Sequence, residues 1–123
     1  MKRRTLGFSN SQESTISDPA RLTGIGAFSR AIVGYFDWNK KDYIRIPIEE
    51  QVELLSLVGD VALENGEPKV HAHCVLGRAN ESTAGGHLIE RFVRPTLEIV
   101  LDETPAYLQR KFDPESGLAL IRT

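Results

Sequence analysis

Beyond residue 22 the chain alternates between apolar and polar side chains, with the two-residue period of strands that expose one face to solvent. Residues 28–36 are almost entirely apolar, which predicts a strand buried on both faces. Residues 37–42 are polar, and residues 43–48 again favour a strand. Together these segments predict a β-hairpin.

A second hairpin is predicted in the middle of the chain. Residues 51–63 are rich in Val and Leu, and Gly59 interrupts them, so we expect a long strand with a bulge or bend at that glycine. The Asn65-Gly66 pair that follows suits the positive φ angles of a type I′ turn. Residues 69–77 are the expected partner strand.

The C-terminal part is predicted to contain further strands and one short helix. Residues 78–86 indicate a polar loop, and residues 92–102 indicate a strand with one apolar face. A Thr-Pro pair opens residues 104–110, which favours a short helix because Thr caps helices and Pro suits their first position. Residues 118–121 predict a last strand. The expected fold class is α/β, more closely α+β, with a mainly antiparallel sheet and few helices.

The first residues differ from the rest of the chain. Residues 1–21 are polar and rich in Ser, and they show no clear period. We therefore expect an N-terminal arm that is disordered or truncated, followed by a single domain over residues 22–123.

Composition is that of one soluble domain. The chain has 123 residues, of which 41% are hydrophobic and 26% charged. Cys74 is the only cysteine, so an intrachain disulfide is excluded and a reducing, cytoplasmic location is expected. No apolar run approaches the roughly 20 residues of a membrane span, and no membrane contact is expected.

Charge argues against DNA binding by the whole domain surface. The formal net charge is −2, whereas nucleic-acid-binding domains are usually strongly basic. Lys2, Arg3 and Arg4 form the basic group of the N-terminal arm. These three residues are the candidate DNA contacts.

All three histidines lie between residues 71 and 87. His71 and His73 are two residues apart in a predicted strand, so both project from the same face. His87 follows Gly85-Gly86, where the backbone can turn sharply and return toward the other two. Three imidazoles suit Zn²⁺ and leave its fourth position open. The bland alternative is that these histidines are ordinary polar side chains on a sheet face.

Other side chains were weighed as a fourth ligand or as outer-shell groups. Glu98, Glu53 and Ser56 are the candidates, because each carries an oxygen on a predicted strand near the histidines in sequence or pattern. Cys74 belongs to the opposite, apolar face of its strand and is expected to be a small buried side chain rather than a ligand.

Five short segments occur in a fixed order. They are residues 25–28 (Ile-Gly-Ala-Phe), 51–60 (Gln-Val-Glu-Leu-Leu-Ser-Leu-Val-Gly-Asp), 71–73 (His-Ala-His), 85–88 (Gly-Gly-His-Leu) and 95–98 (Pro-Thr-Leu-Glu). This ordered set resembles the plant-and-prokaryote-conserved (PPC) domain in its stand-alone bacterial form. The resemblance extends from about residue 22 to residue 121.

The resemblance implies a PPC-like fold assembled as a homotrimer. It also implies a zinc site at His71, His73 and His87, because some members bind zinc through the matching histidines. Plant members carry AT-hook motifs, but this chain has no Arg-Gly-Arg core, so that DNA contact is not carried over. The family places a strand and a helix before residue 25, where this chain has the polar residues 5–20.

Three functions remain open from the sequence. The first is a non-enzymatic, oligomeric PPC protein with a DNA-binding or regulatory role and a three-histidine zinc site. The second is a zinc-dependent enzyme or a small-ligand-binding protein, although no nucleophile, phosphate-loop or helical zinc motif occurs in the chain. The third is a scaffold that contacts other proteins through residues 51–56, the region that plant members use for partners.

Overall fold

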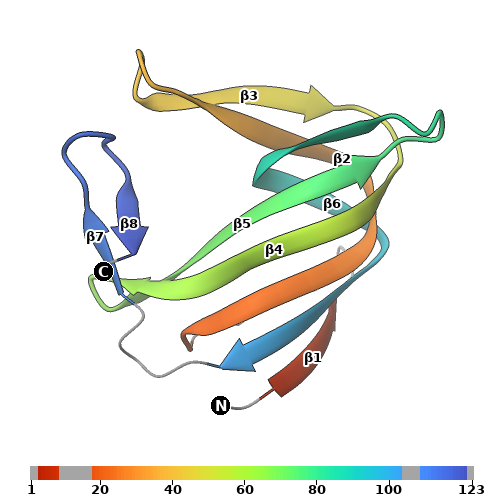
Figure 1. Ribbon diagram of the computed structural model, residues 1–123. Helices are drawn as coiled ribbons and strands as arrows, with labels where there is room; N and C mark the ends of the chain where they lie inside the picture. The colour runs from red at the N-terminus through yellow and green to blue at the C-terminus, as the bar shows by residue number, and fades with distance from the viewer. Residues whose placement is uncertain (1–2, 9–17, 104–108, 122–123) are drawn as a thin grey trace.

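The described chain consists of strands and the turns between them. The computed structural model describes residues 3–8, 18–103 and 109–121 (Figure 1). Its strands are β1 (Arg3–Phe8), β2 (Ala20–Asp37), β3 (Asp42–Ile48), β4 (Val52–Glu64), β5 (Glu67–Gly77), β6 (Thr83–Glu103), β7 (Gln109–Phe112) and β8 (Ala119–Ile121).

One sheet contains all eight strands. Its order is β3-β2-β6-β5-β4-β7-β8, with β1 paired to β6. Strand β2 also pairs with β4, so the pairings close a ring through β2, β6, β5 and β4. Every pairing is antiparallel except the short one between β4 and β7. Figure 1 shows the long strands curling around a common interior, with the β7–β8 hairpin standing at one end.

The interior is apolar because the strands present alternate residues to it. On β5, for example, Ala72, Cys74 and Leu76 are buried. The largest fully buried side chains are Phe28, Leu22, Leu76, Leu101, Val33, Val52 and Val61. A mainly antiparallel sheet with a single apolar core is therefore confirmed.

The bulge in β4 lies earlier than the sequence predicted. The register with β5 shifts between Leu54 and Ser56, and not at Gly59. Leu54 and Leu57 are both buried although they are three residues apart, so one extra residue is needed between them. That residue is Leu55, whose side chain is 54% exposed. The change of phase in the apolar pattern fixes this position.

The turn predictions are confirmed, and one loop is shorter than expected. Asn65 and Gly66 both have positive φ, at 52° and 79°, as a type I′ turn requires. The polar loop expected over residues 78–86 ends at residue 82, where β6 begins. Gly85 and Gly86 therefore lie inside a strand.

The helical part of the fold-class expectation is corrected. No helix occurs within residues 3–8, 18–103 and 109–121, so "few helices" and α/β overstate the helical content. Most of the helix expected at residues 104–110 lies outside the described residues, and its last two residues begin β7. Within the same part of the chain, no helix has the length and hydropathy needed to cross a membrane.

The N-terminal segment contains a strand that its polar composition did not predict. Residues Arg3–Phe8 form β1, which pairs antiparallel with residues 97–102 of β6. Strand β2 begins at Ala20, two residues before the expected start of the domain. The other residues of the predicted arm, apart from residues 18–19, lie outside the described part of the chain.

Candidate metal centre

The three histidines come from two adjacent strands. His71 and His73 lie on the face of β5 opposite the buried Ala72 and Cys74. His87 lies on β6 and is the register partner of His73. Paired residues in an antiparallel ladder project to the same side of the sheet, which brings the third ring to the other two.

The rings meet closely. Each histidine offers a ring nitrogen, and these atoms all lie within 4.8 Å of one another. The Nε2 atoms of His71 and His73 are 3.2 Å apart. Ring centroids are 5.0 Å apart between His71 and His87 and 5.6 Å apart between His73 and His87. The structure thus brings together the three residues that the sequence singled out.

Glycines permit the strands to approach this closely. A Cβ atom at Gly85 would lie 2.7 Å from the Cys74 carbonyl oxygen on β5. At Gly86, where φ is +154°, a Cβ atom would lie 2.6 Å from the Gly34 carbonyl oxygen on β2. Neither separation is possible for a real side chain, so glycine at both positions lets β6 fit between its neighbours just before His87.

An arginine and an aspartate adjoin His71. Arg110 Nη2 donates to Asp60 Oδ1 at 2.7 Å and lies 3.2 Å from His71 Nδ1. Arg110 Nη1 donates to the Ala119 carbonyl oxygen at 3.0 Å. Asp60 is the register partner of His71 on β4, whereas Arg110 enters from β7.

The sequence analysis missed both Asp60 and Arg110. Asp60 follows Gly59 in a strand whose phase was misjudged, and Arg110 lies in a segment expected to be helical. A carboxylate beside a histidine-rich strand is the signal that a correct β4 register would have revealed, because metal-binding histidines usually have such a neighbour.

Hydrogen bonding fixes the proton positions in this group. Arginine only donates, so its contact makes Nδ1 of His71 the acceptor. A neutral His71 then carries its proton on Nε2 and donates it to His73 Nε2. Binding a metal through Nε2 requires the His71 proton to move to Nδ1 or to leave. Asp60 is the neighbouring carboxylate suited to accept a proton donated by Nδ1.

His87 is held by an aromatic ring. Tyr43 of β3 stacks on it with ring centroids 4.4 Å apart and an angle of 18° between the planes. Its Nδ1 atom is buried, and no hydrogen-bond partner for it exists among the described residues. A buried polar atom without a partner is costly, so it calls for a ligand, an ion or a water.

Burial keeps these rings neutral. It lowers the pKa of His87 to about 4, and the neighbouring His71 and His73 lower it further. Burial, Arg110 and His73 likewise lower the pKa of His71, while Asp60 acts in the opposite direction. Neutral imidazole is the form that coordinates a metal, so both side chains are available as ligands at neutral pH.

These residues fit a zinc ion. At Zn–N distances of about 2.0–2.1 Å, tetrahedral ligands lie roughly 3.3 Å apart. The 3.2 Å between His71 and His73 Nε2 matches that spacing, and the unsatisfied His87 supplies a third nitrogen. Three nitrogen ligands with an open fourth position are a common catalytic or ligand-binding arrangement for zinc.

The predicted outer-shell residues lie at different distances from the histidines. Ser56 is half-buried and pairs with Val75, two residues along β5 from His73. Glu53 is exposed and pairs with Gly77, four residues from His73.

Glu98 does not belong to the histidine cluster. It pairs with Ile25 on β2, whereas His87 pairs with Gly34, nine residues away. That offset is roughly 30 Å of strand at about 3.3 Å per residue. Asp60, and not Glu98, is the carboxylate next to the histidines.

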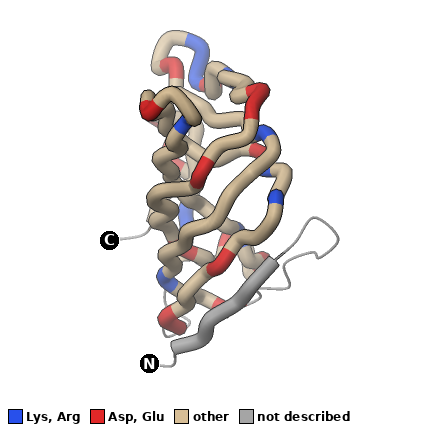
Figure 2. Tube along the Cα trace, turned by 90° about the vertical axis from the view of Figure 1, so that its right-hand side faces the viewer, with Lys and Arg blue, Asp and Glu red and all other residues tan. Residues whose placement is uncertain are grey.

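The predicted DNA contacts are only partly described. Arg3 and Arg4 belong to β1, opposite Asp102 and Leu101 of β6, and Lys2 lies outside the described residues. Elsewhere, basic and acidic residues are interspersed along the trace, and Figure 2 shows no continuous basic face.

The fold and the ordered motifs agree with a known domain family. A family model, the Plants and Prokaryotes Conserved (PCC) domain, matches residues 9–105. The chain belongs to this family. The match covers most of the sequence and includes all three histidines, and it confirms the resemblance drawn from the sequence motifs.

Solved structures support the assignment. A plant- and prokaryote-conserved protein from Pyrococcus horikoshii is 31% identical, with a TM-score of 0.86 over 100% of this chain and 92% of that one. A metal-containing protein from Archaeoglobus fulgidus is 29% identical, with a TM-score of 0.84 over 100% and 94%. A proposed DNA-binding protein from Ralstonia eutropha is 28% identical, with a TM-score of 0.77 over 85% and 73%. The comparison with curated proteins found no match.

Proposed function

We propose that this PCC-domain protein binds a zinc ion through His71, His73 and His87. The observation that carries the proposal is the convergence of three ring nitrogens within 4.8 Å, one of them on a histidine whose buried Nδ1 has no partner among the described residues. The similar protein from Archaeoglobus fulgidus, called metal-containing, supports it. When bound, zinc would offer a Lewis-acidic centre with one position open to water or an anionic ligand.

The test is the metal content of untagged protein, measured by plasma mass spectrometry. We expect about one zinc per chain, and its loss in a His71→Ala/His73→Ala variant. Val75→Ala is the matched control, because Val75 lies on the same face of β5 and offers no ligand. Wild-type protein that stays metal-free after incubation with zinc and removal of excess ions would contradict the proposal.

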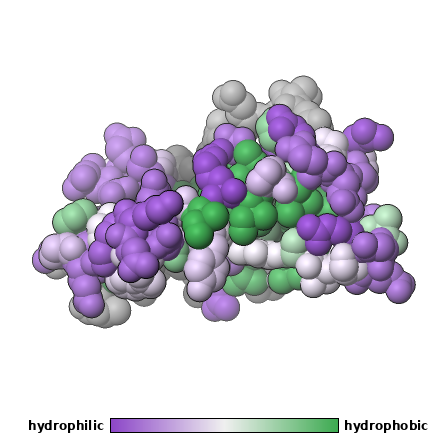
Figure 3. All heavy atoms as spheres, turned by 90° about the horizontal axis from the view of Figure 1, so that it is seen from above, coloured by the Kyte–Doolittle hydropathy of each residue, from purple (hydrophilic) through white to green (hydrophobic). Residues whose placement is uncertain are grey.

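We propose further that the protein is a homo-oligomer, a homotrimer as in its family. Large apolar side chains remain exposed on neighbouring strands of the sheet, among them Ile25 (58%), Val58 (50%) and Val75 (42%). Figure 3 shows one face on which apolar atoms gather between polar flanks. Contiguous exposed apolar surface is typical of an interface.

Light scattering after size-exclusion chromatography measures the assembly. We expect three chains per particle, and we expect Val58→Asp to shift the particle toward single chains. A wild-type protein that elutes as one chain at micromolar concentration would contradict assembly.

DNA association is a second candidate function, which the similar protein from Ralstonia eutropha favours through its description as a proposed DNA-binding protein. The net charge of −2 restricts such contacts to local basic groups such as Lys2, Arg3 and Arg4, multiplied by assembly. Gel retardation of duplex DNA tests it. Retardation that weakens steeply with salt and is lost on replacing these three residues by Ala is expected, and its absence at low salt with micromolar protein contradicts it.

A further inference from the structure

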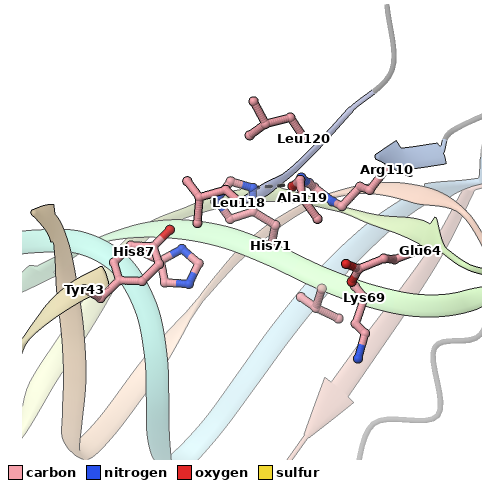
Figure 4. A pocket seen from close by; sticks show the side chains of 10 residues that line it. Tyr43, Glu64, Lys69, His71, His87, Arg110, Leu118, Ala119 and Leu120 are labelled. Atoms are coloured by element: carbon pink, nitrogen blue, oxygen red, sulfur yellow. Dashed lines mark hydrogen bonds between the residues drawn. The ribbon is translucent and has the colours of Figure 1, made fainter. Parts of the chain in front are cut away.

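A cavity opens directly beside the histidine cluster. Its volume is about 220 Å³. His71 and His87 line one side of it, together with Tyr43 and Arg110, as Figure 4 shows. The cavity is therefore continuous with the position at which the proposed zinc would have its open coordination site.

Arg110 gives the cavity an unused hydrogen-bond donor. Its side chain is only 7% exposed, and two of its nitrogens are occupied by Asp60, His71 and the Ala119 carbonyl. The remaining nitrogen, Nε, is buried and finds no acceptor in the described part of the chain. Buried guanidinium groups rarely leave a donor unpaired, so an oxygen-bearing ligand is the natural partner.

The opposite wall is apolar. Leu118 and Leu120 line the cavity from the β7–β8 hairpin, and Leu120 is 43% exposed. The turn before them is fixed, because the buried Ser116 donates from Oγ to Asp113 at 2.7 Å and accepts from the Leu118 amide at 3.1 Å. An ordered apolar wall facing a few polar groups is the usual composition of a small-molecule site.

We propose that this cavity binds a small organic carboxylate. Its carboxylate would lie between the open metal position and Arg110 Nε, and its short apolar chain would lie against Leu118 and Leu120. The inference rests on the proposed zinc binding. Three neutral histidines would leave the double positive charge of zinc uncompensated, and Asp60 already neutralises Arg110, so a monoanion balances the site best.

The chemistry distinguishes this ligand from other classes. An inorganic anion such as phosphate would satisfy Arg110 but would leave the leucine wall facing water. A neutral amide of the same shape would fill the wall but would bring no charge to the metal. Pentanoate, phosphate and pentanamide therefore separate the contributions of head group and tail.

The experiment uses cobalt-substituted protein, because the visible absorption of Co²⁺ reports a change of ligand at the metal. Bound cobalt per chain is measured first. Pentanoate, acetate, phosphate and pentanamide are then titrated. We expect pentanoate to change the spectrum and to bind at least tenfold more tightly than each of the others.

Two variants of the same hairpin locate the tail. Leu120→Asp places a negative charge on the cavity wall and should weaken pentanoate at least tenfold without changing bound cobalt. Phe112→Asp is the control, because Phe112 is 64% exposed on β7 and does not line this cavity. Arg110→Gln should also weaken pentanoate, by removing the Nε donor.

Each outcome decides the proposal. Failure to bind cobalt or zinc overturns both the zinc site and the carboxylate site. Bound cobalt with no preference for pentanoate over pentanamide, or with phosphate binding more tightly, overturns only the carboxylate proposal. Equal pentanoate affinity in Leu120→Asp and wild type overturns the placement of the tail and, with it, the proposed site.

Discussion

His73 of β5 and His87 of β6 are direct register partners, with ring centroids 5.6 Å apart. Their environments nevertheless differ. His73 is exposed, whereas His87 is half-buried and stacked on Tyr43. The two strands thus supply one ligand that is free to adjust and one that is held in place, and this difference leads to distinct predictions for the two side chains.

Replacing His73 with Ala should remove metal and leave the fold almost unchanged. An exposed side chain away from the core contributes about 0.5 kcal/mol or less to the free energy of unfolding. His87→Ala should also remove metal but destabilise the metal-free protein by about 1 kcal/mol, because the stacked pair with Tyr43 is lost. Urea unfolding after chelation measures both. Equal destabilisation by the two variants would contradict this assignment.

Gly59 predicts a separate effect on the site. A Cβ atom there would overlap the His71 carbonyl oxygen and lie 2.8 Å from the Ala72 Cβ atom. Gly59→Ala should therefore push β4 from β5, lower the free energy of unfolding by about 1–3 kcal/mol and weaken metal binding.

The matched control for this prediction is Gly66→Asn. Gly66 has φ of +79° and open space around it, and Asn tolerates that conformation. Its effect should be within about 0.5 kcal/mol. If Gly59→Ala behaves like this control in urea unfolding, the close strand approach is not required.

The sequence predicted the histidine cluster for a sound reason and missed its neighbours for another. Strand alternation places His71 and His73 on one face whatever the rest of the fold does. The register of β4 depends on a single extra residue at Leu55, and one residue of phase decides which side chains face the histidines. Asp60 could not be assigned to the site without that bulge.

Long-range contacts were beyond the local pattern. Arg110 reaches His71 because β7 pairs with the end of β4, a parallel contact between distant segments that no turn signal announces. Strand β1 was missed because its six residues include two arginines and a glycine, so apolar alternation is weak there. Its pairing with β6 supplies the order that composition did not predict.

The stability of the metal-free protein should depend on pH through His87. Its folded pKa is about 4, below the ordinary value of 6.5, so between these values the unfolded chain binds more protons. Stability is therefore fully present above about pH 6.5 and is lost progressively as the pH falls toward 4. Urea unfolding of chelated protein across this range measures the slope. A His87→Gln variant should lose part of it, and an unchanged slope would contradict the assignment.

Cys74 should be unreactive in the native protein. Its side chain is 4% exposed, and burial raises its pKa to about 11, so almost no thiolate exists at pH 8. Because thiolate is the reactive form, Ellman's reagent should modify native protein roughly 100-fold more slowly than protein in denaturant. The chain has no other cysteine, so the signal reports this site alone. Rapid native modification would show that the strand opens there.

The contact between Asp60 and Arg110 should contribute more than any surface ion pair. Arg110 is 7% exposed and Asp60 27%, and their atoms are 2.7 Å apart. Asp60→Asn leaves the guanidinium charge without its counter-ion, so we expect a loss of about 2–3 kcal/mol of unfolding free energy. Zinc affinity should also fall, by about tenfold, because a carboxylate beside His71 orients and polarises that ligand.

The Arg45–Glu90 pair provides the contrast. Its atoms are 3.4 Å apart, but its side chains are 54% and 49% exposed. Solvent screens such pairs, so Glu90→Gln should change the unfolding free energy by about 0.5 kcal/mol or less and leave zinc affinity unaltered. If Asp60→Asn and Glu90→Gln prove equivalent in urea unfolding and in zinc titration, Asp60 has no special role beside His71. If only the zinc titration separates them, Asp60 acts on the ligand and not on the fold.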